Sequence, residues 1–320
     1  MRRPLVTVLA VAALLAATAA CGGDDGEGDI AAGETAKVKV GAIPIVDVAP
    51  LHLGVSKGFF KEQGLDVQVV NTTGGAAAVP GVVSGQFDFA FGNVVSLIVA
   101  KSQGLELKAI AEGNSSTGIN GKDFGGVVVP KGSSINDAAG LAGKTVAVNN
   151  FKNVGDTTVR ASIRKAGGDS TKVNFVELPF PEMPAAIANK RVDAAWIVEP
   201  FFTIAQEQGA KVIASNFVDA APNMTISTYF TSQQTIIEKP GLAERFAAGI
   251  KKSLQYAQDH PDEARQVLLT YTQIPPEVTQ KITLPAWPQE INKASVQTMA
   301  DLMQQDGLVP EKVDVAAILP

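Results

Sequence analysis

The chain has 320 residues, with 27 lysines and arginines, 32 aspartates and glutamates and a formal net charge of −5. This acidic balance argues against nucleic acid as a partner, because binding to a phosphate backbone depends on clustered positive charge. A chain of this length can form two domains with separate cores.

The first residues have the pattern of an export signal. Arg2 and Arg3 precede an uncharged apolar run over residues 5–20, and this arrangement predicts a secretory signal peptide at residues 1–20. The run is too short to span a bilayer comfortably. No later apolar run approaches 18 residues, so no transmembrane helix is expected further along the chain.

Cys21 is the only cysteine in the sequence, so it cannot form an internal disulfide. Thr18, Ala19, Ala20 and Cys21 resemble the bacterial lipobox, although Thr18 stands where leucine or valine is usual. The resemblance implies that Cys21 becomes the first mature residue and carries lipid. The alternative is ordinary cleavage after Ala19 or Ala20, with Cys21 unmodified. Residues 21–35 are then a flexible tether, because glycine and acidic residues cannot bury a core.

From Lys37 onward, short β-branched or aromatic runs alternate with helical patterns. Leu51, Val55 and Phe59 have helical spacing, and Gly64 is the residue expected to end this helix. The alternation predicts an α/β fold with mainly parallel sheets flanked by helices. The predicted strands are Val38–Ile43, Val67–Val70, Phe87–Phe91, Leu107–Ala111, Val127–Val129, Thr145–Val148, Val173–Glu177, Ala194–Val198, Val212–Ala214 and Thr228–Thr231.

After Ser232 the pattern is almost entirely helical. Pro240 and Pro261 each open a predicted helix, and Asn292 caps a third. We expect this C-terminal segment to pack on the first lobe.

Polar and glycine-bearing loops follow several predicted strands. In open α/β sheets, ligands bind beyond the carboxyl ends of the strands, where helix N-termini present free N–H groups. Each loop taken alone is ambiguous. Asp47 and Asp156 could instead cap the N-termini of helices, and Trp196 could instead pack in the core. Glu199 is a stronger candidate for ligand contact, because few structural roles explain a carboxylate placed directly after an apolar strand. Together these loops predict one cleft.

Three segments in order resemble the opening of a known family: AIPIVDVAP at 42–50, GFFKEQGLDV at 58–67 and GQFDFAFG at 85–92. The family is the solute-binding proteins of ABC importers for sulfonates, taurine, nitrate and thiamine-precursor pyrimidines. Segments 137–148 and 192–200 resemble parts of its second lobe. The resemblance covers about residues 37–260.

The resemblance implies a clamshell with the type II periplasmic-binding-protein fold. Lobe 1 is expected at 36–121 plus 226–320 and lobe 2 at 122–225, with crossings near 120–126 and 219–226. The expected ligand contacts are Asp47, Thr73, Gly74, Gly92, Asn93, Ser115, Asn149, Asp156 and Glu199. Trp196 is added because it lies at the end of the predicted strand Ala194–Val198, next to the loop that carries Glu199.

The charge of these loops indicates the chemistry of the ligand. Asp47, Asp156 and Glu199 lie on strand-end loops that carry few basic residues, which favours an amine-bearing or zwitterionic molecule, such as an aromatic amine of the pyrimidine type. A small organic anion held at helix N-termini is the alternative. Candidate stacking surfaces are Phe91, Phe151, Trp196 and Tyr229.

The sequence contains few residues that could act as a catalytic acid, base or nucleophile. The only histidines are His52 and His260, and neither a metal-binding histidine pair nor a Gly-x-Ser-x-Gly motif occurs. His52 lies near the expected cleft mouth, where a packing role is favoured over ligand contact. Residues 140–145 resemble a phosphate-binding loop but lack its first glycine, since position 138 is alanine. The sequence therefore predicts a protein that is not an enzyme, without cofactor or metal.

The combined prediction is an exported, monomeric lipoprotein held on the outer face of the cell membrane by lipid on Cys21. It is expected to capture a small polar organic molecule and deliver it to an ABC permease and its ATPase. Two alternatives stay open: a ligand-sensing surface lipoprotein, and an enzyme related to pyrimidine synthesis, because the resembled family includes eukaryotic pyrimidine-forming proteins.

Overall fold

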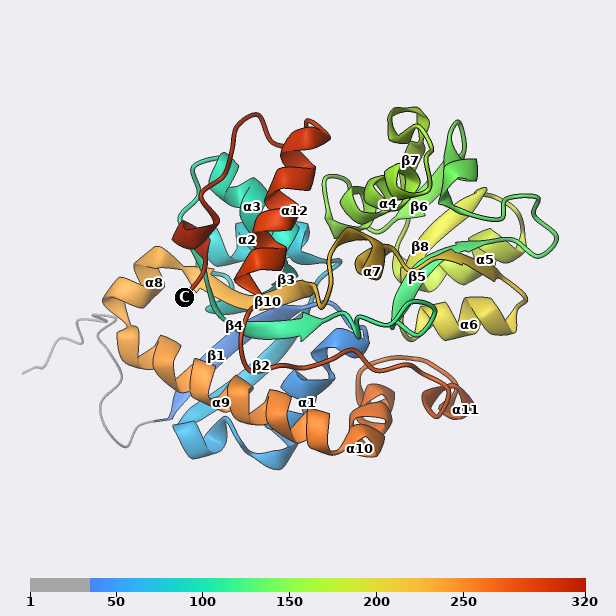
Figure 1. Cartoon of the computed structure of the whole chain (residues 1–320). Coiled ribbons are helices and arrows are strands. Elements are labelled where there is room, and N and C mark those ends of the chain that lie inside the picture. Colours follow the sequence, from blue (N-terminus) through green and yellow to red (C-terminus); the bar gives the residue numbers. More distant parts are fainter. Residues whose placement is uncertain (1–34) are drawn as a thin grey trace, which may run out of the picture.

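The computed structural model describes residues 35–320. The predicted signal peptide, Cys21 and all but the last residue of the predicted tether lie outside the described residues. Two five-stranded sheets form the centres of two lobes that lie side by side (Figure 1). The expected two-lobed α/β fold is confirmed.

The first sheet has the strand order β2-β1-β3-β10-β4. Its strands are β1 (Ala36–Ala42), β2 (Leu65–Asn71), β3 (Phe89–Asn93), β4 (Leu107–Ser115) and β10 (Thr225–Ser232). β1 pairs in parallel with β2 and β3, whereas β10 pairs antiparallel with β3 and β4.

The second sheet repeats this pattern, with the order β7-β6-β8-β5-β9. Its strands are β5 (Gly125–Val129), β6 (Thr145–Val148), β7 (Asn174–Glu177), β8 (Ala194–Val198) and β9 (Lys211–Ala214). β6 pairs in parallel with β7 and β8, and β5 pairs antiparallel with β8 and β9. The chain enters this sheet between β4 and β5 and returns between β9 and β10.

The prediction of mainly parallel sheets is confirmed, because four strands of each sheet run in the same direction and one, β10 or β5, runs against them. The antiparallel pairings all involve β5 or β10, which are the first strands after each crossing between the lobes. A strand reached by a helical crossover within one sheet is placed in parallel, but a strand that arrives from the other lobe has no such constraint.

Helices cover both faces of each sheet (Figure 1). The helices of the first lobe's N-terminal part are α1 (Ala49–Lys57), α2 (Gly75–Val83) and α3 (Val94–Ser102). Those of the second lobe are α4 (Val154–Lys165), α5 (Met183–Ala188), α6 (Phe201–Glu207) and α7 (Asn216–Ala220). Short 3-10 turns are η1 (Val46–Val48), η2 (Lys61–Gln63), η3 (Ala138–Leu141), η4 (Ser170–Lys172), η5 (Phe180–Glu182), η6 (Val267–Thr270) and η7 (Val315–Ile318).

The first helix ends earlier than its apolar spacing predicted. α1 stops at Lys57, and Gly58 follows it in the left-handed region with φ 80°. A glycine in this conformation ends a helix without the steric cost that a side chain would impose. Phe59 therefore follows the helix, and Gly64 closes η2 instead.

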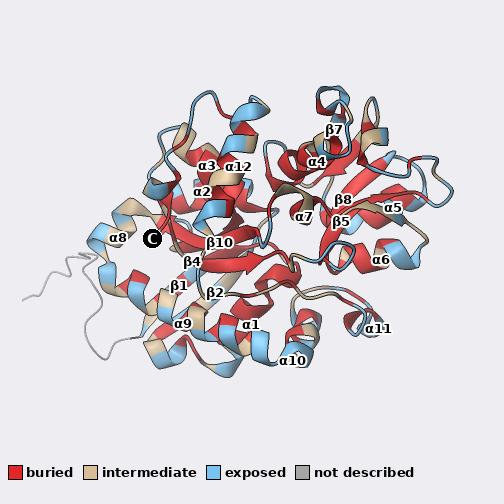
Figure 2. Ribbon diagram, viewed as in Figure 1, coloured by how far each residue is buried: buried red, intermediate tan, exposed pale blue. Residues whose placement is uncertain are grey.

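The C-terminal segment is helical and packs on the first lobe, as expected. Its helices are α8 (Gln233–Glu238), α9 (Pro240–Asp259), α10 (Pro261–Gln266), α11 (Pro276–Thr279) and α12 (Lys293–Gln305). Phe246 of α9 stacks on Phe89 of β3 with ring centroids 4.1 Å apart. The outward faces of α8, α9 and α10 are exposed and the strands are buried, so α9 covers one face of the first sheet (Figure 2).

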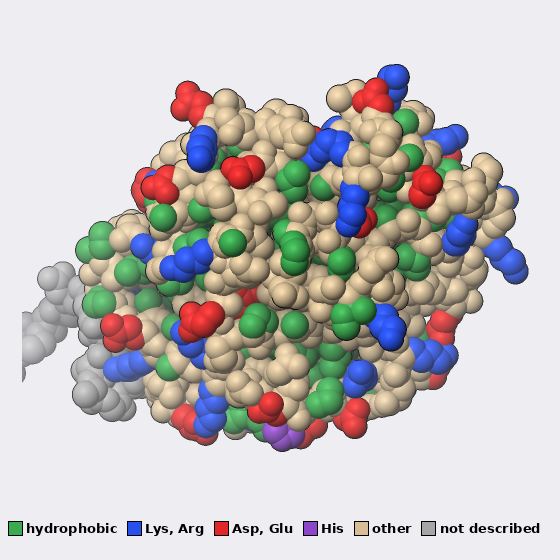
Figure 3. All heavy atoms as spheres, in the orientation of Figure 1, with side chains coloured by type: hydrophobic (Ala, Val, Ile, Leu, Met, Phe, Trp, Pro, Cys, Tyr) green, Lys and Arg blue, Asp and Glu red, His purple; other side chains and the backbone are tan. Residues whose placement is uncertain are grey.

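Acidic and basic side chains are interspersed on the face shown in Figure 3, where a notch separates the two lobes at the top of the view. Within residues 35–320, the helices lack the combination of length and apolar character that crossing a membrane requires.

Candidate functional site

A cavity lies between the lobes, at the edges where β1, β3, β6 and β8 end. The carboxyl ends of parallel strands meet at one edge of a sheet, and the antiparallel β10 begins at the same edge, so these five strands and the loops after β2 and β7 deliver residues to this place. The first lobe contributes Ile43, Ile45, Asp47, Gly74, Gly75, Phe91, Gly92, Asn93, Ile226 and Ser227. The second contributes Asn149, Val154, Phe180, Trp196, Val198 and Phe217.

The lobes touch directly around this cavity, so little free space remains. Asn93 Nδ2 donates to Asn153 Oδ1 across the interface at 2.5 Å, and Val46 N donates to Glu199 O at 3.2 Å. The free volume is about 30 Å³, whereas pockets for small molecules commonly measure about 300–1,000 Å³. A cavity of this volume has no room for a small molecule unless the lobes move apart.

Two glycine positions permit the close approach of backbones at the cavity. Gly74 has φ 146°, and a Cβ at this position would lie 2.5 Å from Asn150 Oδ1 of the other lobe. A Cβ on Gly92 would lie 2.9 Å from the Cα of Gly75. Larger residues would hold the lobes apart at the first position and separate β3 from α2 at the second.

Asp47 is the one titratable residue among those lining the cavity. Its side chain is buried, and Oδ1 accepts a hydrogen bond of 3.0 Å from Asn114 Nδ2. Oδ2 has no hydrogen-bond partner among the described residues. Burial raises the pKa of Asp47 to about 7, against the opposing effect of the bond from Asn114. The site thus holds a carboxyl group with one acceptor atom to spare.

The C-terminal segment fixes the loop that carries Asp47. Tyr271 donates its hydroxyl hydrogen to Ile45 O at 2.9 Å, and Trp287 Nε1 donates to Asp47 O at 3.3 Å. His52 stacks on the Tyr271 ring with centroids 3.8 Å apart, and burial lowers the pKa of His52 to about 4. His52 packs behind the loop and does not line the cavity.

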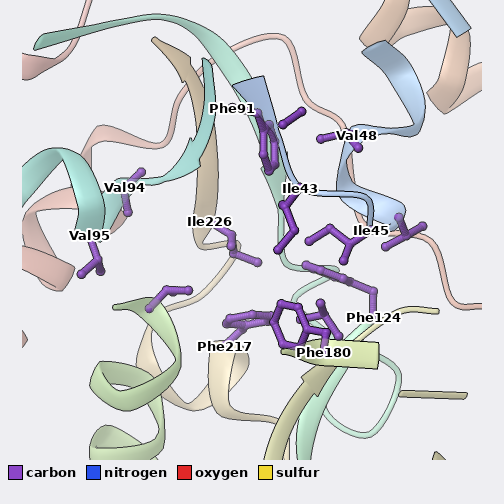
Figure 4. Close-up of a cluster of buried hydrophobic side chains, with 14 of the residues drawn as sticks. Ile43, Ile45, Val48, Phe91, Val94, Val95, Phe124, Phe180, Phe217 and Ile226 are labelled. Atoms are coloured by element: carbon purple, nitrogen blue, oxygen red, sulfur yellow. The ribbon is translucent and has the colours of Figure 1, made fainter. Parts of the chain in front are cut away.

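Apolar side chains from both lobes form the walls. Phe180 and Phe217 of the second lobe lie opposite Ile43 and Ile226 of the first (Figure 4). Trp196 makes edge contacts with Phe180 and Phe217, at centroid distances of 5.3 and 5.9 Å. Its Nε1 is buried without a hydrogen-bond partner among the described residues.

Three helix N-termini point at the cavity, and two of them are already capped. Asn93 caps α3 by accepting from Ser96 N at 3.1 Å, and Asn153 caps α4 by accepting from Val154 N at 2.6 Å. α2 begins at Gly75 without a side-chain cap. The first N–H groups of α2 are therefore the donors that a helix offers here.

Two of the three predicted carboxylates lie outside the cavity lining. Asp156 belongs to the capping box of α4, where its oxygens accept from Lys152 N at 2.8 Å and Asn153 N at 2.7 Å. Burial raises the pKa of Asp156 to about 6. This is the helix-terminus role that the sequence left open for it.

Glu199 is buried and turned away from the cavity. Its Oε1 accepts from Thr203 Oγ1 at 2.7 Å and from Thr283 N at 3.2 Å, and its Oε2 accepts from Thr203 N at 3.0 Å. Burial raises the pKa of Glu199 to about 7. Its carboxylate thus joins α6 to the C-terminal segment of the first lobe, while its carbonyl oxygen meets Val46.

The remaining expected contacts divide in the same way. Gly74, Gly92, Asn93, Asn149 and Trp196 line the cavity together with Asp47. Thr73 lies at the rim, where its carbonyl oxygen accepts from Asn149 Nδ2 at 3.4 Å. Ser115 does not line the cavity and donates to Glu112 Oε1 at 2.9 Å.

Only some of the aromatic residues predicted as stacking surfaces line the cavity. Phe91 and Trp196 line the cavity, whereas Tyr229 is buried behind Phe91, with ring centroids 5.3 Å apart. Phe151 is half exposed and lines a separate groove beside α2 and α3. Sequence reasoning missed Phe180 and Phe217, although Phe180 follows β7 within a few residues and could have been found by the same strand-end rule.

The model of the family described as NMT1/THI5 like matches residues 45–264. A putative aliphatic sulfonates-binding protein of Bacillus subtilis (strain 168) is 25% identical, over all of this chain and 95% of its own length. The formylaminopyrimidine-binding protein of Halalkalibacterium halodurans is also 25% identical, over 74% of this chain and 70% of its own length.

Solved structures share the fold. The alkanesulfonate-binding protein SsuA from Xanthomonas axonopodis pv. citri, bound to MOPS, superposes with a TM-score of 0.75 at 18% identity. The match covers 90% of this chain and 99% of that one. A shorter similarity links 30% of this chain to 27% of a 4-amino-5-hydroxymethyl-2-methylpyrimidine phosphate synthase, THI11, of Saccharomyces cerevisiae, at 31% identity.

Proposed function

The chain belongs to the NMT1/THI5-like family, and from this premise we propose that it is an extracytoplasmic solute-binding lipoprotein of an ABC importer. It captures a small polar organic molecule between its lobes and delivers it to a membrane permease and its ATPase. The relatives that match it over most of its length are named as binding proteins. The similarity to a synthase covers 30% of the chain, so binding without catalysis is the better supported function.

One observation carries the proposal: the cavity is built jointly by both lobes and is almost closed. Six lining residues come from the second lobe, and Asp47 and the α2 N-terminus come from the first. A solute held there contacts both lobes only in the closed conformation, so its binding energy favours closure. A permease can then distinguish loaded from unloaded protein by shape.

Closure can be measured by small-angle X-ray scattering on the chain without residues 1–20 and with Cys21→Ser. The small-molecule fraction of the growth medium should raise the unfolding temperature and reduce the radius of gyration. Deleting the gene should lower uptake of the solute that causes closure. Unchanged uptake would favour sensing, and a solute that leaves the radius unchanged would contradict capture by closure.

We further propose that lipid on Cys21 holds the monomer at the outer face of the cell membrane. Two or more acyl chains give stable anchoring, whereas an unlipidated tether would leave the protein free. Cys21→Ser should move the protein from the membrane fraction to the supernatant after centrifugation. A serine variant that still sediments with membranes would contradict lipid anchoring.

A further inference from the structure

We infer that a basic groove beside the crossing between β4 and β5 binds a small soluble oxyanion with at least two negative charges, and that Arg265 is its main contact. The groove lies where this crossing, the corner between α9 and α10 and residues 280–287 meet, and its volume is about 760 Å³. None of the residues that line it lines the cavity between the lobes. The inference therefore concerns a second site and is independent of the proposed function.

The charged residues that line the basic groove are Lys122, Arg265 and Lys281. Among the described residues, no aspartate or glutamate lines it, although the whole chain has a net charge of −5. Several basic side chains lie in the lower right part of the view in Figure 3, in the region of α10 and the β4–β5 crossing. Three positive charges around one groove raise the local concentration of anions and favour a multivalent anion.

Arg265 is a largely buried cation without a strong carboxylate partner. Its side chain is 23% exposed, and its Nε donates to Ile282 O at 3.2 Å, which orients the guanidinium group. Nη1 lies 3.4 Å from Asp262 Oδ1, whereas charge-assisted hydrogen bonds measure about 2.7–2.9 Å. The Asp262 side chain is also 86% exposed. A partly desolvated guanidinium group therefore gains from an anion that offers it two oxygen atoms.

Lys122 supplies a second cation from the crossing between the lobes. Its Nζ has no hydrogen-bond or ion-pair partner among the described residues. The neighbouring Asp123 is buried, and its carboxylate accepts from Ser116 Oγ, Thr117 N and Phe124 N. Asp123 is therefore bound within the crossing, and the Lys122 ammonium group remains available to an anion.

Lys281 supplies the third cation. It is paired with Glu207 of α6, but the two side chains are 57% and 37% exposed. An exposed ion pair contributes little to stability, so an anion can share Lys281 with Glu207 at little cost. Gln258 also lines the groove, and its Oε1 accepts from Trp287 N, which leaves its amide hydrogens as further donors. The groove thus combines a guanidinium group, two ammonium groups and an amide, all of which donate hydrogen bonds to anion oxygens.

Isothermal titration calorimetry with citrate, inorganic phosphate and acetate tests the inference on the chain without residues 1–20 and with Cys21→Ser. Sodium chloride is adjusted so that every titration has the same ionic strength, because general screening would otherwise affect the comparison. We expect one equivalent of citrate or phosphate to bind about tenfold or more tightly than acetate, which has a single charge. Failure of both multivalent anions to bind, or equal binding of acetate, would overturn the inference.

Variants assign the bound anion to this groove. Arg265→Gln should weaken its binding by about tenfold, because the contact with two oxygens is lost, and Lys122→Gln should weaken it by about threefold. Lys131→Gln, at an exposed position after β5 and outside the groove, is the matched control and should change nothing. Circular dichroism verifies that each variant folds, and Lys122→Gln keeps the test decisive if Arg265→Gln does not fold. Unchanged affinity in a folded Lys122→Gln or Arg265→Gln protein would overturn the groove as the anion site.

Discussion

At the scale of single residues, three buried carboxyl groups have similar sequence settings and different roles. Asp47, Asp156 and Glu199 each follow a strand, but only Asp47 lines the cavity. The difference comes from partners far away in the sequence: Asn114 lies 67 residues from Asp47, and Thr283 lies 84 residues from Glu199. The local sequence pattern identifies such residues as candidates. Which of them keeps a carboxylate oxygen without a hydrogen-bond partner depends on the residues that surround it in the folded chain.

Burial of these groups predicts how stability depends on pH. A carboxyl group with a raised pKa binds its proton more tightly in the folded than in the unfolded chain, so stability is highest below the unfolded pKa and falls as pH rises through the folded pKa. For Glu199 this window runs from the ordinary glutamate pKa of 4.5 to about 7. The effect amounts to at most about 3 kcal/mol.

Glu199→Gln should therefore flatten the fall in unfolding temperature between about pH 5 and pH 7, because the amide does not titrate. Differential scanning fluorimetry at several pH values measures this slope. Glu238→Gln, on the exposed part of α8, is the control and should keep the slope of the parent protein. An equal slope in the Glu199→Gln protein would show that this group does not contribute.

At the scale of elements, local sequence signals predicted that the strands and helices exist, but they did not predict the direction of every strand or the exact end of every helix. All ten predicted strands and the helices opened by Pro240 and Pro261 are present, because β-branched runs and helix-starting prolines act within a few residues. The end of α1 was misplaced, since two glycines, Gly58 and Gly64, both take the left-handed conformation and the first one ends the helix. Strand direction in β5 and β10 depends on how the chain crosses between lobes, which no local pattern encodes.

At the scale of the whole molecule, ion pairs join the two lobes. Arg164 of α4 forms an ion pair with Asp306, which follows α12. The Asp306 side chain is only 5% exposed. Lys281 and Glu207 form a second pair between the lobes, with side chains 57% and 37% exposed. Exposed pairs contribute little, whereas removing one partner of a buried pair leaves an uncompensated charge.

Arg164→Ala should therefore shift the protein toward an open form. The radius of gyration of the ligand-bound protein should rise toward the unbound value, and affinity for the cleft ligand should fall several-fold. Lys281→Ala is the matched control at the exposed pair and should have a much smaller effect. Equal effects of the two substitutions on affinity and radius would contradict the role of the Arg164 pair.

The sequence by itself determined the α/β class, the order of the elements, the family and the strand-end loops from which a site is built. These follow from periodicity, glycine and proline positions and ordered motifs, all of which act over short distances along the chain. Only the tertiary structure decided which loop residues share the cavity, because Phe217, Ile226 and Asp47 become neighbours through two crossings between lobes. It also decided that Asp47 keeps an unpartnered oxygen while Glu199 does not, since hydrogen-bond saturation depends on atoms brought together from distant parts of the chain.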